Sequence, residues 1–528
     1  MAGALVLLAA CAHPEPPPPL QATATSFESL TPNGEPFGWY VEADAASVSI
    51  AVDRTPDEGP LLTLRNDGED PAFVYSVLPS DACNRAASVE ILARSDTAGT
   101  LSGVIIQPSL GRPGVGDPVP LSPDWREITY HVTAETCLGS GVGTGALVFG
   151  DADIRQIDVR RDGRRLVPQT LSPVTAHDLE ILRRLARTED LSGHHPETRL
   201  PLTARIIAMG EASHGAAALF EMKLQILQAM AAEGTLGVVA LELPAAAADR
   251  VDAYTSGRSD DRSVILDALV YPAWQTEEMM AVIDWLRTHN ASASAPVRFA
   301  GFDVQHPIWA ARGLALTGID MTHVVAAMNA QDIRGAISAL DALEPQWARL
   351  ESGPRYARLL RRGLLVDRAD LGGESRGFYM AQEALELLQH SEKTLALWAD
   401  NTHITKLPGA MGGVLHAELG DDYLAIGMTF AAGQYSAYGP ETPYSADPAY
   451  EGTHEKILAD AGLNSDLVRL SDLPPEHPLR EPRGWRYIGS TPQIFDQFLP
   501  HHLEDHFDAI GFVQRSDATT YLTEHGFR

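Results

Sequence analysis

The sequence predicts an α/β domain with a largely parallel sheet, preceded by an all-β sandwich (jelly-roll-like) domain. The chain has 528 residues, which is more than one hydrophobic core normally serves. Residues 21–168 consist of short, alternating apolar segments separated by Gly, Pro, Asp and Asn, a pattern typical of antiparallel strands. In residues 172–528, apolar runs alternate with amphipathic stretches, which indicates βαβ units.

Residues 1–20 predict an exported lipoprotein. A short apolar run, residues 4–10, precedes Cys11 and resembles the bacterial lipobox, in which the cysteine is acylated. The proline-rich residues 13–19 are typical of an extended spacer. No segment offers the roughly 20 apolar residues that a membrane-spanning helix needs. We therefore expect a signal peptide and a location in the bacterial cell envelope, periplasmic or on the outer membrane, with membrane contact only through the lipid on Cys11.

Two further cysteines, Cys83 and Cys137, form an even pair in an oxidising compartment. A disulfide between them would close a loop of about 55 residues and stabilise the fold by roughly 4 kcal/mol. Two free, buried thiols are the alternative.

The charge balance argues against one class of partner. The chain has 40 Lys and Arg against 70 Asp and Glu, a net charge of −30. Because such a surface repels phosphate backbones, we do not expect nucleic acid as a partner.

The strand pattern of the first domain is typical of a sandwich. Together with Gly38-Trp39 and a late strand entered through Trp125, it resembles the jelly-roll modules of extracellular carbohydrate-active enzymes. A glycan is therefore a candidate partner, and a purely structural role is equally open. The expected strands lie at residues 48–52, 62–64, 128–132 and 154–159.

In the second domain, polar residues follow the apolar runs. The expected strands are residues 205–210, 236–241, 297–302 and 394–398, and a helix is expected over residues 216–233. The polar residues that follow these strands are Glu211, His214, Glu242, Asp303, Asp400 and His403. Because the carboxyl ends of parallel strands share one edge of the sheet, we expect these side chains to line one crevice.

The residue types suggest proton transfer. His214 precedes Gly215, which leaves room for a substrate, and an imidazole titrates near neutral pH. Carboxylates at Glu211 and Glu242 would fix its tautomer and favour the imidazolium. Lys223 could offer positive charge to an oxyanion, although a surface lysine is as consistent with its position. Because no Gly-x-Ser-x-Gly motif is present, attack by activated water is favoured over an acyl-serine.

A divalent metal site is the main competitor, since Glu, His and Asp would converge on the crevice. The sequence has no His-Glu-x-x-His spacing. We therefore expect no cofactor, and keep a metal-dependent hydrolase as the alternative.

The segment Gly210–Gly215, followed by Lys223 and Glu242, resembles the signature of the erythromycin esterase family. The resemblance continues in order through Trp274, Asp303, Arg376, residues 398–403 and 412–433, and covers about 350 residues. It implies hydrolysis of a small-molecule ester, with macrolide lactones as the family's named substrates. It implies catalytic roles for His214 as general base and for Glu211, Glu242 and His403. We expect the remaining residues of the crevice to bind the substrate: Lys223, Asp303, Asp400, Trp274 and Arg376.

The chain departs from the family pattern at three points. Asp400 stands where a histidine is usual, Lys223 where an arginine is common, and Gly377 where an aspartate often follows Arg376. Hydrolysis of a carboxylic ester, a macrolactone or an envelope ester, is therefore favoured over macrolide resistance itself. A non-catalytic lipoprotein that binds a ligand or glycan is the second alternative.

Overall fold

The computed structural model of the chain describes residues 171–186, 204–437, 443–489 and 497–522, together with most of 27–165. The gaps within that first part are residues 28–29, 32–35, 37, 43–47, 56–58, 69, 79–85, 98, 107–113, 134–141 and 162–163. The predicted lipidation site Cys11 and the predicted disulfide pair Cys83 and Cys137 lie outside the described residues. So does most of the predicted junction between the domains, because residues 166–170 are not described.

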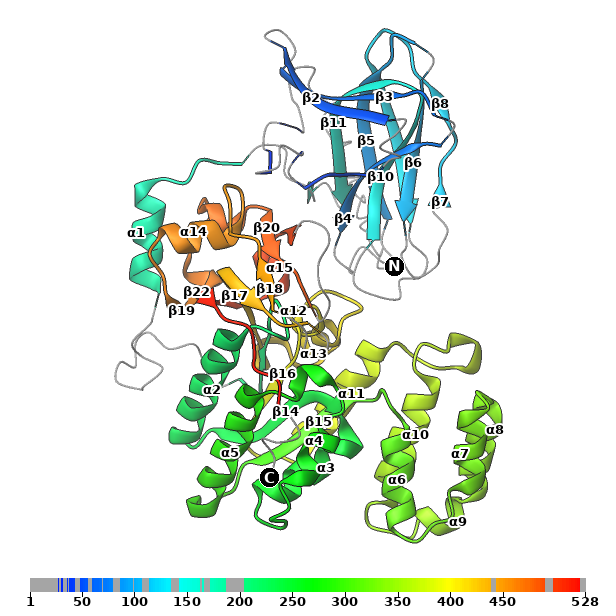
Figure 1. The fold of residues 1–528 in the computed structure, drawn as a ribbon, viewed down its shortest axis with the longest axis vertical. Helices are drawn as coiled ribbons and strands as arrows, with labels where there is room; N and C mark the ends of the chain where they lie inside the picture. Colours follow the sequence, from blue (N-terminus) through cyan, green and yellow to red (C-terminus); the bar gives the residue numbers. More distant parts are fainter. Residues whose placement is uncertain are drawn as a thin grey trace, which may run out of the picture.

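The first domain is a sandwich of two antiparallel sheets (Figure 1). One sheet has the order β1-β4-β10-β6-β7, with β8 on β6, and the other has the order β2-β3-β11-β5-β9, with β12 on β11. Apolar side chains of both sheets, such as Val74 and Ile91, fill the space between them. The strands are β1 (Tyr40–Glu42), β2 (Val48–Thr55), β3 (Gly59–Asn66), β4 (Ala72–Leu78), β5 (Ala86–Arg94), β6 (Thr100–Ile106), β7 (Gly114–Val115), β8 (Val119–Pro120), β9 (Arg126–Thr133), β10 (Val142–Phe149), β11 (Ala152–Arg161) and β12 (Arg164–Arg165).

The second domain is built on one eight-stranded sheet in the order β15-β14-β16-β13-β17-β22-β19, with β18 on β17. The pairs from β15 to β22 are parallel, and β18 and β19 are antiparallel to their neighbours. The predicted mixed α/β class with a largely parallel sheet, after an all-β domain, is confirmed. The strands are β13 (Ile206–Met209), β14 (Leu236–Pro244), β15 (Arg298–Asp303), β16 (Thr394–Trp398), β17 (Tyr423–Tyr435), β18 (Tyr444–Ala446), β19 (Ser465–Arg469) and β22 (Ala509–Ser516).

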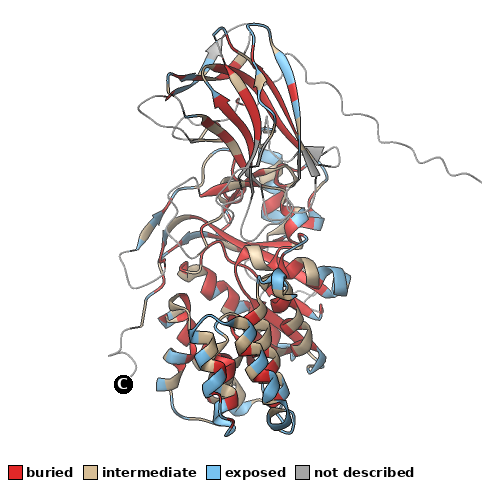
Figure 2. Ribbon diagram, turned by 90° about the vertical axis from the view of Figure 1, so that its right-hand side faces the viewer, coloured by how far each residue is buried: buried red, intermediate tan, exposed pale blue. Residues whose placement is uncertain are grey.

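Helices cover both faces of this sheet, because side chains of alternate strand residues point to opposite sides. Ile207 and Met209 of β13 pack with one set of helices, and Ile206 and Ala208 pack with the other. Figure 2 shows the buried residues concentrated in the sheet and the exposed residues on the outer sides of the helices. The first set is α2 (Ala217–Ala232), α3 (Ala245–Thr255), α4 (Ser263–Ala268) and α5 (Glu277–Ser292), and the second is α1 (Ala176–Leu185), α11 (Arg376–Gln389), α13 (Met411–Leu419), α14 (His454–Asp460) and α15 (Leu503–His506).

A helical insert follows β15 and has a hydrophobic cluster of its own. Its helices lie to one side of the sheet in Figure 1 and return the chain to α11. This insert was not predicted from the sequence. The helices are α6 (Ile308–Leu316), α7 (Thr322–Asn329), α8 (Ile333–Ala342), α9 (Glu344–Trp347) and α10 (Gly353–Leu365).

Three smaller elements complete the domain near the site. They are α12 (Asn401–Ile404), which directly follows β16, and the antiparallel pair β20 (Arg483–Arg486) and β21 (Phe498–His501). No helix among the described residues is both long enough and apolar enough to cross a membrane.

Candidate active site

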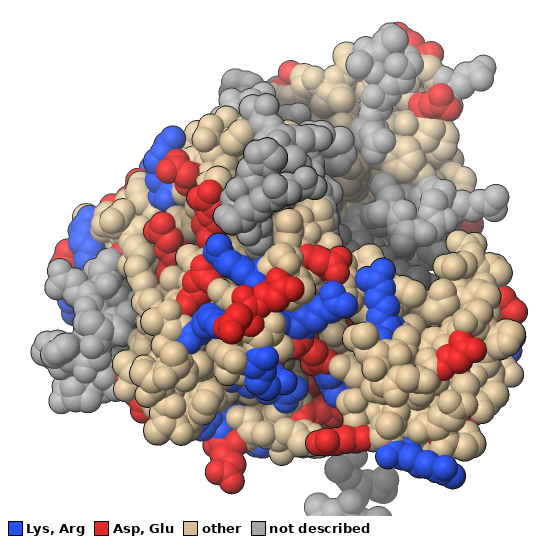
Figure 3. Space-filling view, turned by 60° about the horizontal axis from the view of Figure 1, so that its bottom comes forward, with Lys and Arg blue, Asp and Glu red and all other residues tan. Residues whose placement is uncertain are grey.

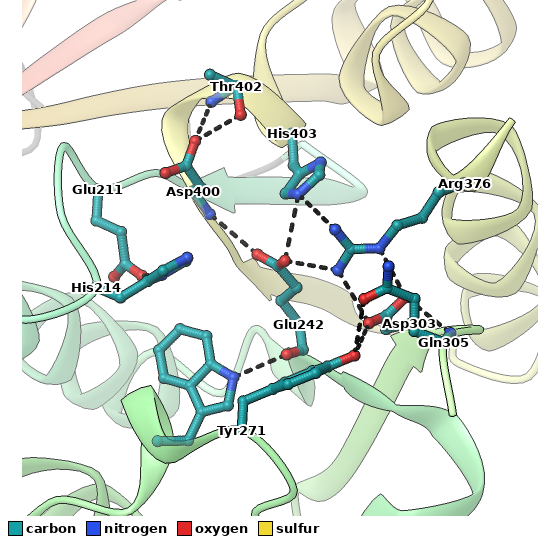
Figure 4. Close-up of polar contacts among 11 residues, drawn as sticks. Glu211, His214, Glu242, Tyr271, Asp303, Gln305, Arg376, Asp400, Thr402 and His403 are labelled. Carbon is teal, nitrogen blue, oxygen red and sulfur yellow. Dashed lines mark hydrogen bonds and ion pairs between the residues drawn. The ribbon is translucent and has the colours of Figure 1, made fainter. Parts of the chain in front are cut away.

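The carboxyl ends of β13, β14, β15 and β16 meet at one edge of the sheet because these strands are parallel neighbours. Five of the six predicted polar side chains stand at or beyond these ends: Glu211, His214, Asp303, Asp400 and His403. Glu242 differs, because β14 continues to Pro244 and its register with β15 shifts between Leu241 and Pro244. Figure 4 shows Glu242 at the centre of the group, with His214 on one side and His403 and Arg376 on the other.

His214 is the end of a buried chain of polar contacts. Its Nδ1 lies 2.6 Å from Oε1 of Glu211, and the Nζ of Lys223 donates to Oε2 of Glu211 at 2.5 Å. The Nε1 of Trp398 donates to the same Oε2 at 3.0 Å, and the Trp398 ring lies 4.4 Å from the Lys223 ammonium. Glu211 and Lys223 are fully buried, whereas the His214 side chain is 13% exposed. Of these three side chains, only the imidazole of His214 therefore has exposed surface.

The surroundings of His214 hold it in the charged form. Burial by itself lowers the pKa of the imidazole, but the hydrogen bond and charge of Glu211, and the charges of Glu242 and Asp400, raise it to about 9. Burial disfavours the Glu211 carboxylate, yet Lys223 and His214 leave its pKa below the ordinary value. Glu211 is thus an ionised partner for an imidazolium.

Backbone contacts fix the loop that carries His214. Its N–H donates to the carbonyl oxygen of Gly489 at 3.2 Å, and Ser213 forms a bridge with the same residue. A Cβ on Gly215 would stand 1.9 Å from the carbonyl oxygen of Ser436. Gly215 therefore allows the loop to pack against residue 436, which differs from the substrate approach that the sequence suggested.

The carboxylate of Glu242 contacts both Arg376 and His403. Its Oε1 lies 2.8 Å from a guanidinium nitrogen of Arg376 and 3.2 Å from Nε2 of His403. Burial raises the pKa of this carboxyl, but His403, Arg376 and His214 together hold it well below its ordinary value. The side chain of His403 is 23% exposed, so it faces the crevice opposite His214.

Arg376 also holds Asp303. Its guanidinium donates to both carboxylate oxygens, at 3.1 Å and 2.9 Å, and the hydroxyl of Tyr271 donates to Oδ2. The N–H of Gln305 donates to Oδ1 at 3.1 Å. Burial and the charge of Asp303 raise the pKa of the Tyr271 hydroxyl, so it remains a donor. Asp303 is saturated by these contacts and positions Arg376.

Asp400 is the N-cap residue of α12, and one of its carboxylate oxygens caps the helix. Its Oδ1 accepts from the backbone N–H and the hydroxyl of Thr402, at 2.7 Å and 2.6 Å, an N-cap that explains why the helix begins here. Its backbone N–H lies 3.4 Å from Oε2 of Glu242.

The guanidinium of Arg376 already neutralises Glu242 and Asp303, as a metal ion between these carboxylates would have to do. The two carboxylates are therefore a poor fit to a metal site. Within the part of the chain that the structure describes, no group of three or more His, Cys, Asp or Glu side chains is arranged to hold a metal.

The structure brings the nine predicted side chains into one connected group but changes the role of three. Lys223 has no exposed surface, and its ammonium is bound to Glu211, so the predicted contact with substrate is wrong. Asp303 is equally buried beneath Arg376. Trp274 is 1% exposed, and its Nε1 donates to the carbonyl oxygen of Glu242 while its ring meets His214 edge-on at 5.1 Å.

Sequence reasoning missed two members of the group. Tyr271, in the loop before Trp274, anchors Asp303, and no local pattern marks it. Trp398 lies in the family-like segment 398–403, but no role was predicted for it. A tryptophan at the end of a buried strand requires an acceptor for its N–H, and this one donates to Glu211.

Comparison with known proteins finds one matching family, a curated relative and solved structures with a similar fold. The profile of the family described as erythromycin esterase matches residues 236–363 and 355–516. Erythromycin esterase type II of Escherichia coli is 22% identical over 404 residues, covering 61% of this chain and 91% of the relative. A succinoglycan biosynthesis protein of known structure has a TM-score of 0.55 at 18% identity, covering 67% of this chain and 100% of that chain. A Bacillus cereus protein has a TM-score of 0.54 at 18% identity, covering 66% and 100%. At this identity the two structures show a common fold alone.

Proposed function

This chain belongs to the erythromycin esterase family, and we propose that it hydrolyses a carboxylic ester by attack of water activated at His214. The observation that carries the proposal is the buried series Lys223–Glu211–His214, which ends in a single exposed imidazole. Because Nδ1 is bound to Glu211, Nε2 is the nitrogen that can take a proton in the crevice.

The reaction balances with these groups alone. Nε2 of neutral His214 takes a proton from water as the water oxygen bonds to the ester carbonyl carbon, which gives a tetrahedral oxyanion. Arg376 supplies positive charge on the side of the site opposite His214, and the partly exposed His403 lies beside it. The intermediate collapses, the carbon–oxygen ester bond breaks, and the imidazolium returns the proton to the leaving alkoxide. Acid and alcohol are the products.

A panel of chromogenic esters and macrolides tests this proposal with wild type and His214→Ala. We expect kcat/KM to fall by about 10²- to 10⁴-fold in the variant, the usual contribution of a general base. His323→Ala removes an exposed histidine on α7 and is the matched control, expected to retain full activity. Hydrolysis by His214→Ala at the wild-type rate would contradict the assignment.

A chelator discriminates between this proposal and the metal-dependent alternative. Activity that survives dialysis against a chelator supports attack by His214-activated water without a metal. Activity that is lost and then restored by a divalent cation would favour the alternative.

We also propose that the protein is exported, anchored in the cell envelope through Cys11, and carries a glycan-binding sandwich. The lipobox-like segment that ends at Cys11 supports export and the lipid anchor, and the sandwich fold of the first domain supports glycan binding. The net charge of −30 argues against nucleic acid as a partner. On the face drawn in Figure 3, acidic and basic side chains are intermixed and no broad basic patch stands out. Metabolic labelling with a fatty acid, compared between wild type and Cys11→Ser, tests the anchor. Retardation in gels containing polysaccharides tests the sandwich.

A further inference from the structure

One carboxylate oxygen in the crevice has no donor. Oδ1 of Asp400 is occupied by Thr402, but no hydrogen bond or ion pair within the described chain reaches Oδ2. Asp400 as a whole is only 6% exposed. Oδ2 is not among the buried polar atoms that lack a partner in the described chain, so it keeps contact with solvent, and a ligand that reaches it can neutralise or hydrogen-bond the carboxylate.

The free oxygen faces the reaction centre. Figure 4 shows the carboxylate of Asp400 with one oxygen toward Thr402 and the other turned to the side on which His214 lies. A Cβ built on Gly489 would stand 3.9 Å from Oδ2, and the carbonyl oxygen of Gly489 accepts from the N–H of His214. Oδ2 of Asp400 and the loop that carries His214 therefore both lie next to Gly489, on the same side of the site.

The charges around the crevice leave Asp400 without a permanent counterion. Lys223 neutralises Glu211, and Arg376 is shared between Glu242 and Asp303. Four carboxylates thus face two permanent cations. His214 adds a positive charge when it is protonated, but the proposed mechanism needs His214 neutral when it accepts a proton.

We propose that Asp400 is a specificity-determining residue that selects esters carrying a positively charged ammonium group close to the scissile bond. This inference rests on the proposed ester hydrolysis and names the substrate class.

A pair of esters tests the proposal. The acyl group is the same in both, and the alcohols are 2-(trimethylammonio)ethanol and its carbon isostere 3,3-dimethylbutanol. The two differ in charge and hardly in shape, and the quaternary charge does not titrate. The readout is the ratio of the two kcat/KM values, because any general damage to the site cancels in it.

We expect wild type to prefer the cationic ester, and Asp400→Asn to reduce the preference about tenfold, mainly through KM. Asparagine keeps the N-cap of α12 and removes the charge. Asp332→Asn, which makes the same change at the exposed N-cap of α8, is the control and should leave the ratio unchanged. An active Asp400→Asn enzyme with the wild-type ratio would overturn the proposal.

Binding of non-hydrolysable amide analogues of the same two compounds, measured by calorimetry, separates this proposal from the proposed reaction. Preferential binding of the cationic amide that depends on Asp400 supports cation recognition even if neither ester is hydrolysed, in which case the hydrolytic function fails alone. If the cationic amide binds no better than the neutral one in wild type, cation recognition is refuted whatever the activity.

Discussion

The protonation of His214 decides at which pH this site can work. Its partner Glu211 lies 2.6 Å away and is ionised, and Glu242 and Asp400 add negative charge from the other strand ends. The pKa of His214 is raised to about 9, so the imidazolium predominates at neutral pH. A general base must be neutral, and only a small fraction of the enzyme is ready to react below that pKa.

We therefore expect kcat/KM for an uncharged ester to rise about tenfold per pH unit up to roughly pH 9 and then level off. The rate constant rises with pH because the raised pKa keeps the proton on His214 below about pH 9 and releases it above that pH. In Glu211→Gln, the acid limb should move toward the ordinary histidine pKa of about 6.5, with a lower plateau. A wild-type profile already flat at neutral pH would show that His214 is not the base.

The residue types at the strand ends could be predicted from sequence, and their partners could not. An apolar run followed by Glu211, His214 or Asp303 is visible locally, and so is the parallel arrangement that gathers them. Which cation neutralises which carboxylate depends on distances across the fold. Lys223 illustrates this, since only the packing of α2 under β13 shows that its ammonium turns to Glu211 rather than to the crevice.

At the scale of elements, the position of α12 depends on the absence of a side chain at the end of β13. A Cβ on Gly210 would stand 2.0 Å from Oδ1 of Asn401. Asn401 accepts from the N–H of Met428 at 3.0 Å and donates to its carbonyl oxygen at 2.9 Å, which ties α12 to β17. Because α12 also carries His403 and begins at Asp400, a shift of Asn401 moves both.

We expect Gly210→Ala to lower kcat by at least about tenfold and to destabilise the protein by roughly 1–3 kcal/mol, the usual cost of overpacking. Gly511→Ala in β22 is the control, because an added Cβ there meets the Sδ of Met222 at 2.8 Å and the Cγ of Met428 at 2.9 Å, and both flexible side chains can yield while the backbone contacts of Met428 with Asn401 stay in place. Kinetics and denaturant midpoints of both variants provide the comparison. Equal losses of kcat in the two would show that α12 tolerates the shift.

The strands were easier to predict than the connections between them. The expected strand over residues 394–398 and the expected helix over 216–233 match β16 and α2 within one residue. The insert α6–α10 was missed because its helices have ordinary amphipathic patterns, and nothing local places them between Asp303 and Arg376. The backbone pairing of Ala216 with Ala518 joins segments about 300 residues apart, which no periodicity reveals.

At the scale of the whole molecule, the hydrophobic clusters divide by domain. The sandwich cluster draws its buried members from Phe27 to Val159, and the three clusters of the α/β domain draw theirs from Leu182 to Val513. The first described residues of the second domain contact a late segment of the same domain, because Arg483 donates to the carbonyl oxygen of Ser172. Domains with separate cores can unfold separately.

Calorimetry of the full-length protein should therefore resolve two unfolding transitions. Ile91→Ala empties a fully buried position in β5 of the sandwich, and Leu397→Ala does the same in β16 beneath the site. Each truncation should cost about 2–5 kcal/mol and lower the midpoint of its own transition, by roughly 10 °C in the sandwich and roughly 5 °C in the larger α/β domain, with little effect on the other. Loss of hydrolysis on heating should follow the transition that Leu397→Ala displaces, because His214 and Glu242 lie in the same α/β domain. One transition shifted by both substitutions would mean that the sandwich and the α/β domain fold as a single cooperative unit.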